Sequence, residues 1–373
     1  MNLCLMLLSS AFLSVPWHLP TPSPAAPDTR NQFQGITPEL AAAQKKADSG
    51  DIESQLFLAK AYAQGNGVPI DTTLAAKWFR KAADQGNAVA EDNLGVMFVA
   101  GDGVEKDKAA ALQWYRKAAR QRNARAMFHL GTMYYNGDGV PIDDAMAYAW
   151  FFLAREAGDQ LGTEAAVRAE SELKPETMIQ GLANIARQFD SGEVLAVDQE
   201  RAARWWLLAA QRGNQDAKVA IAGKYLNGQG VNQDYAAAKR WCESALKEDK
   251  SDRLYDPRAA YCLGIIYDRG LGVAKELKTA REWYERSAAA GNIVGSRRLA
   301  QMCADGEGGK QDKVKAALIL IDLVRHGDKD SIPKLTELGR KFDKKEWEPV
   351  QKQLRAKKID PATIPGFEQL QQP

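Results

Sequence analysis

The sequence predicts an all-α protein built from about seven copies of one helix-turn-helix repeat. A phrase of 36 residues recurs along the chain, and its clearest copy runs from Gly86 to Gln121. The tryptophans of the first three copies, Trp78, Trp114 and Trp150, follow one another at this spacing. A fixed period in this range is typical of repeat arrays, in which each repeat buries its apolar face against its neighbours.

Each repeat begins with a predicted helix that ends in a glycine turn. In the clearest copy, Leu94, Gly95 and Phe98 share one face of a helix with 3.6 residues per turn. The lack of a side chain at Gly95 lets a neighbouring helix approach closely. Gly101 then takes the left-handed position that ends a helix, where glycine has the least steric cost. Gly103 completes the turn that leads to the second helix.

The second helix of each repeat is predicted from a cap and an aromatic pair. An aspartate that can cap the helix follows the turn in each of the first three repeats, at Asp71, Asp107 and Asp143. In the clearest copy the helix then carries Trp114-Tyr115 and Ala118-Ala119. We expect the aromatic pair to fill the wide part of the space between helices and the alanines to fill the narrow part.

The repeats follow one another with one large break in register. Trp205 follows Trp150 by 55 residues instead of 36, which predicts a helical insert. The expected organisation is a leader (1–25), a linker with a leading helix (26–49), repeats 1–3 (50–157), the helical insert (158–176), repeats 4–7 (177–326), and a C-terminal cap and tail (327–373). The residues assigned to architecture are Gly65, Gly67, Trp78, Gly101, Gly103, Trp114, Gly137, Gly139, Trp150, Trp205, Gly228, Gly230, Trp241, Gly270, Gly272 and Trp283.

The repeated phrase Leu-Gly-x-x-Tyr, Gly-x-Gly-Val, Asp, Trp-Tyr-x-x-Ala-Ala resembles the Sel1-like repeats, a branch of the tetratricopeptide-like α-solenoids. The resemblance covers residues 50 to about 325. It implies a right-handed α/α superhelix that works as an adaptor or scaffold. Members of this family serve in bacterial envelope, secretion, signalling and host-interaction assemblies, and in quality control in the eukaryotic endoplasmic reticulum.

The first 27 residues differ from the rest of the chain. Leu3 to Val15 is an apolar run that is too short to span a bilayer, and Ser, Pro and Ala dominate after it. This pattern resembles a secretory signal peptide cleaved after Ala25. It favours export to the periplasm or the extracellular space, with association with the envelope as an option and no transmembrane span. The alternative is a cytoplasmic protein with a disordered leader, because Met1-Asn2 carries no Lys or Arg.

Charge and cysteine content limit the partners and the chemistry. The net charge is +2, from 50 basic and 48 acidic residues, which argues against nucleic acid as a partner. Cys242, Cys262 and Cys303 remain once the leader is excluded, and an odd number does not make a closed disulfide framework. A single bridge between Cys242 and Cys262 is compatible with their positions. We favour the interpretation that all three pack as small apolar residues.

No pattern in the chain predicts catalysis, a cofactor or a metal. The Gly-x-Gly turns follow helices and lack the Gly-Lys-Ser/Thr ending of a phosphate-binding loop. His129 and His326 lie in distant repeats without other ligands at metal-binding spacing. Ser-x-x-Lys occurs three times, but the companion motifs of serine acyl enzymes are absent. We therefore predict a protein that is not an enzyme.

The remaining function is recognition, because stacked first helices usually line a concave surface. In each first helix, the residue directly before the repeated Leu and the residue two positions after it point away from the apolar face of the helix. The residue types at these two positions differ between repeats. We predict a protein or peptide partner bound there. The alternatives are an envelope glycan- or peptidoglycan-binding module and a serine hydrolase of the β-lactamase type. The predicted contact residues are Asn93, His129, Asn184, Arg187, Arg298 and Gln301.

Overall fold

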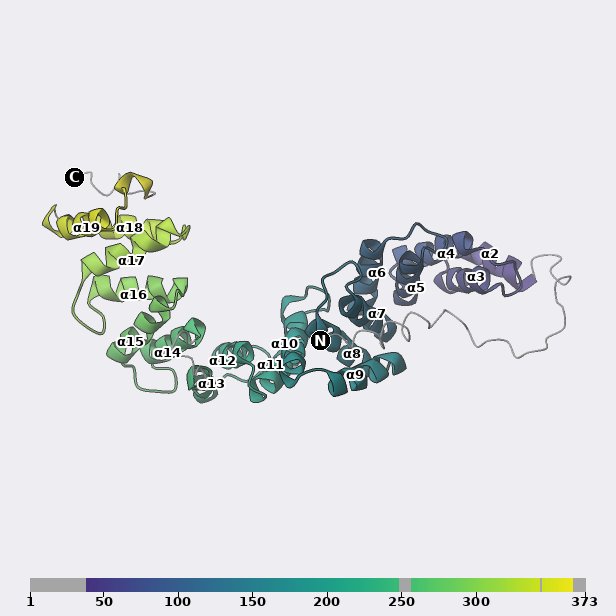
Figure 1. The fold of residues 1–373 in the computed structure, drawn as a ribbon, viewed down its shortest axis with the longest axis horizontal. Coiled ribbons are helices and arrows are strands. Elements are labelled where there is room, and N and C mark those ends of the chain that lie inside the picture. The colour runs from purple at the N-terminus through teal and green to yellow at the C-terminus, as the bar shows by residue number, and fades with distance from the viewer. Residues whose placement is uncertain (1–37, 248–255, 343, 365–373) are drawn as a thin grey trace, which may run out of the picture. The chain divides into compact units, whose positions relative to one another are not determined.

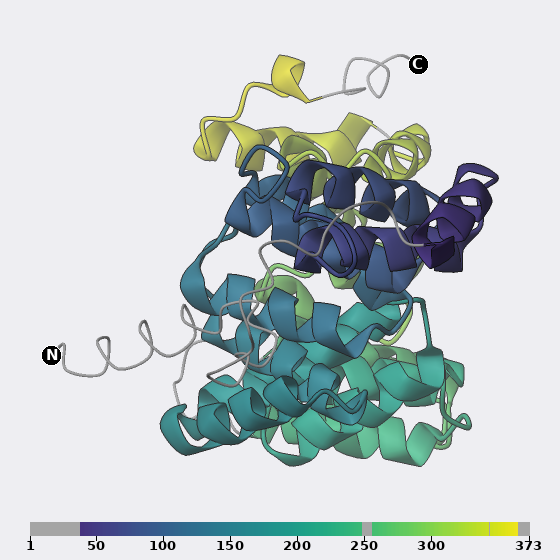
Figure 2. The same ribbon diagram turned by 90° about the vertical axis from the view of Figure 1, so that its right-hand side faces the viewer.

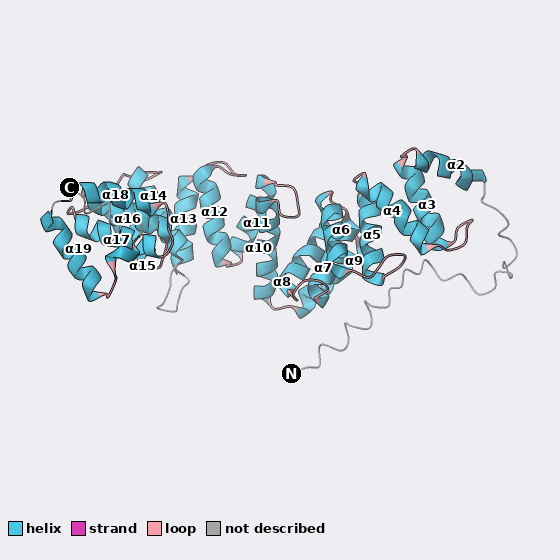
Figure 3. Cartoon of the chain, turned by 90° about the horizontal axis from the view of Figure 1, so that it is seen from above, coloured by secondary structure: helices cyan, strands magenta, loops and turns pink. Residues whose placement is uncertain are grey.

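The computed structural model of this chain describes residues 38–247, 256–342 and 344–364. These residues form eighteen α-helices and one short 3-10 helix, without a strand among them (Figure 3). The predicted all-α fold built of helix pairs is confirmed. The chain falls into two compact units, the first ending at Ala111 and the second beginning at Leu112.

Seven helix pairs correspond to the seven repeats. The first helices of the pairs are α3 (Ile52–Gln64), α5 (Ala88–Ala100), α7 (Ala124–Asn136), α10 (Pro175–Ser191), α12 (Gln215–Asn227), α14 (Pro257–Arg269) and α16 (Ile293–Asp305). The second helices are α4 (Thr72–Asp84), α6 (Lys108–Arg120), α8 (Asp144–Glu156), α11 (Gln199–Gln211), α13 (Tyr235–Lys247), α15 (Leu277–Ala289) and α17 (Lys313–Arg325). The other elements are α2 (Pro38–Asp48), α9 (Gln160–Glu172), α18 (Ser331–Arg340), α19 (Lys344–Ala356) and the 3-10 helix η1 (Pro361–Thr363).

The helix starts are fixed by short polar side chains. The carboxylates of Asp71, Asp107 and Asp143 accept backbone N–H groups at the starts of α4, α6 and α8, which confirms the predicted caps. Asn87 and Asn123 cap α5 and α7 in the same manner. Caps of this kind mark the starts of most of the helices, whereas α10, α15 and α18 begin without a side-chain cap.

At two turns of the second unit, the second glycine brings neighbouring repeats into close contact. Gly230, which follows α12, lies against the carbonyl of Gln199 at the start of α11, in the preceding repeat. Gly308 lies in the same way against the carbonyl of Leu277 at the start of α15. A Cβ atom at either glycine would overlap that carbonyl. These positions therefore hold successive repeats at backbone distance.

Helix α9 occupies the segment that was expected to be a helical insert, and it begins on the period of the repeats. Its cap, Asp159, follows the cap Asn123 by 36 residues, and Asn123 follows the cap Asn87 by the same spacing. The helix packs against α7 and α8, whereas the following α10 packs against α8 and α11 (Figure 1). Helix α8 therefore contacts three helices, its own first helix α7 and the two helices that follow it, α9 and α10. The register of the tryptophans shifts after it.

The cysteines of the second unit differ from the favoured interpretation. Cys242 on α13 and Cys262 on α14 form a disulfide, with Cα atoms 6.6 Å apart. Both residues occupy core positions, as expected, but the two positions face each other across the junction between α13 and α14. The bridge thus joins two repeats directly. Cys303 is the free cysteine among the described residues, and it is buried.

Two helices close the C-terminal end of the second unit. Helices α18 and α19 both pack against α17, and they are the yellow helices of Figures 1 and 2. From α19, Trp347, Val350 and Leu354 are buried in a core that also contains Leu320 of α17. This apolar stripe explains why Trp347 is present although it belongs to no repeat.

Repeat 2 has an arginine where most other repeats have a glycine after the second helix. Arg122 has a φ of 65° there, whereas the equivalent Gly86 and Gly158 have φ values of 81° and 89°. A left-handed conformation costs a residue with a side chain about 1–2 kcal/mol. We expect Arg122→Gly to raise the free energy of unfolding by about 1 kcal/mol, after subtraction of the extra backbone entropy of glycine. Urea unfolding measures this. Arg122→Ala is the control, because it removes the side chain without relieving the backbone, and an equal gain in both variants would contradict the explanation.

Candidate binding groove

Two of the predicted contact residues join successive first helices. On α10, the guanidinium of Arg187 donates to Asn184 at 2.7 Å and to Asp216 of α12 at 3.1 Å. Asp216 is also paired with Arg258 at the start of α14. Asn184 is only 7% exposed. It is therefore closed to a partner, and its role is to orient Arg187 toward the next helix.

Arg298 is likewise engaged between repeats. Its guanidinium donates to both carboxylate oxygens of Asp268 on α14, at 2.8 and 2.9 Å, and pairs with Glu307 at 2.7 Å. The Tyr284 hydroxyl donates to Asp268 at 3.2 Å. Burial of the Asp268 carboxyl favours its neutral form, but hydrogen bonds from Arg298 and Tyr284 and the charge of Arg298 outweigh this and lower its pKa.

This lowered pKa predicts a loss of stability in acid. A carboxyl whose pKa is lower in the folded state than in the unfolded state stabilises the fold above its unfolded value of 3.8, and the gain disappears as the pH falls through the folded value. We expect the urea midpoint of the protein to fall between pH 5 and pH 3, and the fall to be shallower in Asp268→Asn. Parallel pH profiles for the two proteins would contradict this assignment.

The other three predicted contact residues differ in their accessibility. The half-buried His129 ring packs on Tyr115, with ring centroids 4.8 Å apart. Asn93, on α5 of the first unit, donates to the Val89 carbonyl of its own helix at 2.7 Å. Gln301 is exposed on α16 and lines a groove. Of the predicted contact residues, Gln301 is the one that lines this groove.

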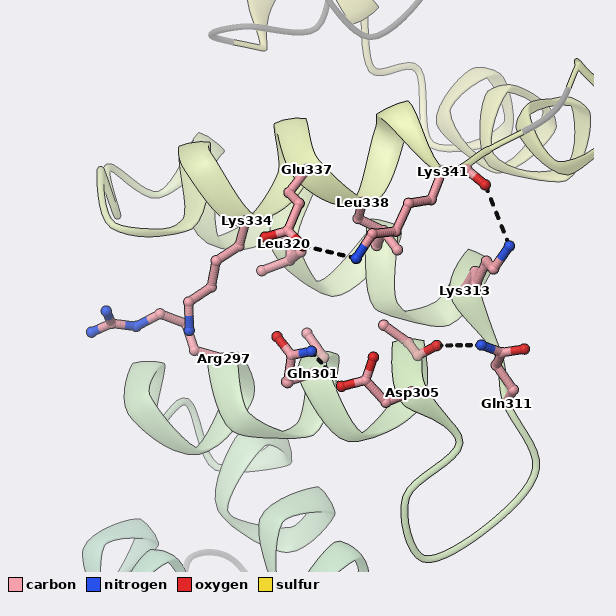
Figure 4. Close-up of a pocket in the computed structure, with 12 residues that line it drawn as sticks. Arg297, Gln301, Asp305, Gln311, Lys313, Leu320, Lys334, Glu337, Leu338 and Lys341 are labelled. Carbon is pink, nitrogen blue, oxygen red and sulfur yellow. Dashed lines mark hydrogen bonds and ion pairs between the residues drawn. The ribbon is translucent and has the colours of Figure 1, made fainter.

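The groove lies between α16 and α18, above α17 (Figure 4). It encloses about 110 Å³. Residues three, four and seven apart line it on both helices, so one face of each helix points inward. The lining residues are Arg297, Ala300, Gln301, Ala304 and Asp305 from α16, Gln311, Lys313 and Leu320 from the turn and α17, Lys334, Glu337 and Leu338 from α18, and Lys341 directly after α18.

The groove has an apolar base and a charged rim. Ala300, Ala304, Leu320 and Leu338 provide its apolar surface, and small residues on α16 leave the space open. Sequence reasoning identified Gln301 but missed Arg297 and the residues of α18. Helical spacing could have found Arg297, which stands one turn before Gln301. The α18 residues gave no signal, because their segment was assigned to capping alone.

The rim carries ion pairs that are exposed to water. Glu337 accepts from Lys341 at 2.8 Å, and Gln301 donates to Asp305 on its own helix. This pairing lowers the pKa of Glu337 and raises that of Lys341, in each case mainly through the hydrogen bond. Lys334 is exposed and makes no ion pair with any described residue. The other cations of the rim are paired: Arg297 with Asp328 and Asp330, and Lys313 with Glu346. Among the cations that line the groove, Lys334 is therefore the unpaired one.

The described residues contain no group of three or more His, Cys, Asp or Glu side chains that could hold a metal ion. Over the same residues, every helix is too short or too polar to cross a membrane. The features of the groove that can bind a ligand are its concave shape, its apolar base and the charged side chains of its rim.

Equal helix pairs stacked along the chain define a helical-repeat protein. The chain belongs to the Sel1 repeat family: the profile of the Sel1 repeat matches at residues 52–87, 88–123, 124–159, 180–214, 216–249, 257–292 and 295–319. The resemblance predicted from the repeated phrase is confirmed. Proteins of this family commonly mediate protein–protein interactions and are generally non-catalytic scaffolds.

Known relatives are similar over part of their length. The chain is 29% identical over 106 residues to an uncharacterised protein of Neisseria meningitidis serogroup B, 28% of this chain and 21% of that protein. It is 32% identical over 83 residues to the mouse protein sel-1 homolog 2, 22% of this chain and 11% of that protein. It is 26% identical over 153 residues to chitin synthase regulatory factor 3 of Schizosaccharomyces pombe, 39% of this chain and 16% of that protein. The matches thus span about a fifth of these relatives or less.

Solved structures with related sequences are also repeat proteins. A protective antigen of uropathogenic Escherichia coli, described as displaying an SLR fold, is 29% identical, with a TM-score of 0.43 over 87% of this chain and 73% of that one. A Sel1 repeat protein of Oxalobacter formigenes is 28% identical, with a TM-score of 0.39 over 80% of each chain.

Proposed function

We propose that this protein is a non-catalytic scaffold that holds a protein or peptide partner in the groove between α16 and α18. The observation that supports this most is the groove itself, where an apolar base meets a charged rim on facing helices. Interfaces of this type combine a buried apolar anchor with a polar rim. Here the first helix of the last repeat, α16, and the capping helix α18 supply the two sides of the groove, and Leu320 of α17 contributes to its base.

We further propose that the protein acts outside the cytoplasm. The bridge between Cys242 and Cys262 supports this, since disulfides persist in oxidising compartments and are rare in the cytosol. The leader over residues 1–25 lies outside the described residues, so its role as a signal peptide stays a prediction. Fractionation of the host, followed by alkylation and mass spectrometry of Cys242 and Cys262, tests both points. Recovery of the chain in the cytosol with both thiols free would refute export.

Site-specific crosslinking tests partner binding. Charge reversal at Arg187 or Arg298 is unsuitable, because these residues hold repeats together. A photoreactive amino acid at Gln301 of the full chain, expressed in the native host, should crosslink one defined protein. The same group at Glu282, exposed on α15, is the control. Equal crosslinking from both positions, or none from Gln301, would reject the groove as the binding site.

The glycan-binding alternative predicts aromatic side chains on the groove. The residues that line the groove between α16 and α18 include no aromatic side chain, so this groove offers no platform for stacking a sugar ring. The lining of this groove therefore favours a peptide over a saccharide.

A further inference from the structure

We infer that the partner held in the groove between α16 and α18 continues across α14 to α12, where it packs one large apolar side chain on Gly223. This inference rests on the proposed function and specifies a second contact of the same partner. It follows from a glycine inside a helix that its described neighbours do not explain, from the apolar side chains around it, and from their place on the face that carries the groove.

Gly223 lies in the interior of α12, where glycine is less favourable than alanine because it loses more backbone entropy on folding. Two other glycines inside helices are required by packing. A Cβ atom at Gly131 would lie 2.5 Å from the Phe151 ring, and one at Gly264 would lie equally close to a tyrosine ring. A Cβ atom at Gly223 would meet no described residue within 4 Å, apart from the adjoining backbone of its own helix. The fold therefore has room for a side chain at this position, and a second molecule can use that room.

The side chains around Gly223 are apolar and half-buried. On α12, Val219 precedes the glycine by one turn and Leu226 follows it by about one turn, so the three residues share one face of the helix. On the neighbouring helix α14, Tyr261 and Ile265 hold the positions equivalent to Val219 and Gly223, counted from the glycine that ends each helix. These five residues form an apolar strip across α12 and α14.

The apolar strip lies on the same face of the repeats as the groove. Gly223 and Ile265 each stand five residues before the glycine that ends their helix, and Gln301, which lines the groove, stands five residues before Gly306. Helix α14 contacts both α12 and α16 (Figure 1). Because neighbouring helix axes are about 10 Å apart, roughly six residues of an extended segment span from Gln301 to Gly223.

The charged side chains beside the apolar strip are already paired. On α12, Asp216 pairs with both Arg187 and Arg258, and on α14, Asp268 pairs with Arg298. A charged ligand group would lose its hydration beside charges that already have partners, whereas an apolar side chain gains free energy by leaving water. The strip therefore selects an apolar side chain, and the missing Cβ atom of the glycine leaves space for a large one, such as Leu, Met or Phe.

The test selects random twelve-residue peptides, displayed on phage, on the full chain and measures the enriched peptides by fluorescence anisotropy. We expect them to share a large apolar residue, and alanine in its place should lower the affinity about tenfold. Gly223→Leu, which fills the open position, should also lower the affinity about tenfold. Gly223→Ala should weaken binding about threefold and yet raise the midpoint of thermal unfolding, because alanine is the better helix former. Weaker binding by a more stable protein cannot result from misfolding.

The matched control is Ala236→Leu, which adds a leucine at an exposed position on α13, the second helix of the same repeat. It should bind the peptides like the unaltered chain. Equal loss in Ala236→Leu and Gly223→Leu, full binding by Gly223→Leu, or failure to enrich any peptide would overturn the inference. So would self-association of the unaltered chain that Gly223→Leu abolishes in sedimentation, since a second copy would then cover the strip. If Gln301 crosslinks a partner equally in the Gly223→Leu chain, this inference fails while the proposed function stands.

Discussion

Replacement of Gly230 by alanine is expected to lower the free energy of unfolding by about 3 kcal/mol or more, against about 1–2 kcal/mol for Gly228→Ala. The two glycines stand in one turn and have nearly equal φ values, 71° and 68°. The cost of a left-handed alanine is therefore similar for both. The difference in free energy of unfolding between the two variants therefore measures the contribution of the close contact between neighbouring repeats.

That approach involves backbone, which cannot move aside as a side chain can. A Cβ atom at Gly230 would overlap the Gln199 carbonyl at the start of α11, whereas the nearest neighbour of a Cβ atom at Gly228 is Gln233 Cβ, at 3.6 Å. Gly230→Ala must therefore separate α11 from the following repeat. Urea unfolding monitored by tryptophan fluorescence measures both variants. Equal losses would show that φ alone explains the glycines.

The second large effect is expected from Asp190→Ala, at about 3–5 kcal/mol. Lys224 on α12 is only 5% exposed, and its ammonium donates to Asp190 of α10 and, at 2.8 Å, to Gln199. The Trp206 indole N–H also donates to Asp190. Loss of the carboxylate would leave a buried ammonium without its counter-charge, and desolvation makes that state costly.

Two further variants separate this effect from a general loss of charge. Lys315→Ala removes the pair with Glu285, whose side chains are 44% and 41% exposed, and should cost about 1 kcal/mol or less. Asp190→Leu/Lys224→Met removes both buried charges, and we expect it to recover most of the stability of the unaltered chain. The explanation is wrong if the double variant is as unstable as Asp190→Ala when both are measured by urea unfolding at neutral pH.

The architecture could be predicted because the repeats are local in sequence. Most helix starts have their own cap, as at Asp71 or Asn123, and each first turn has its own glycine. These signals act within a few residues, so they can be identified without knowing which helices pack against each other. Burial of Trp78 and Trp150 follows from the same period, since an apolar position repeated every 36 residues meets the next repeat at the same place.

The candidate site could be predicted only in part. Gln301 was found because it varies in type and faces away from the core, but the same rule selected Arg187 and Arg298, which form ion pairs between repeats. A variable polar position has the same sequence signature whether it contacts a partner or the next helix. The α18 side of the groove had no periodic pattern to mark it, because α18 belongs to no repeat.

The sequence by itself determined that the chain forms paired helices, where they begin and end, and which family it belongs to. Only the tertiary structure decided that Cys242 meets Cys262, that Asp190 neutralises Lys224, and that α16 and α18 enclose a groove. The reason is the separation in sequence between the residues that specify each feature. A cap or a turn depends on residues within one helical turn, whereas these contacts join side chains 20 to 34 positions apart or more, whose meeting depends on how helices pack.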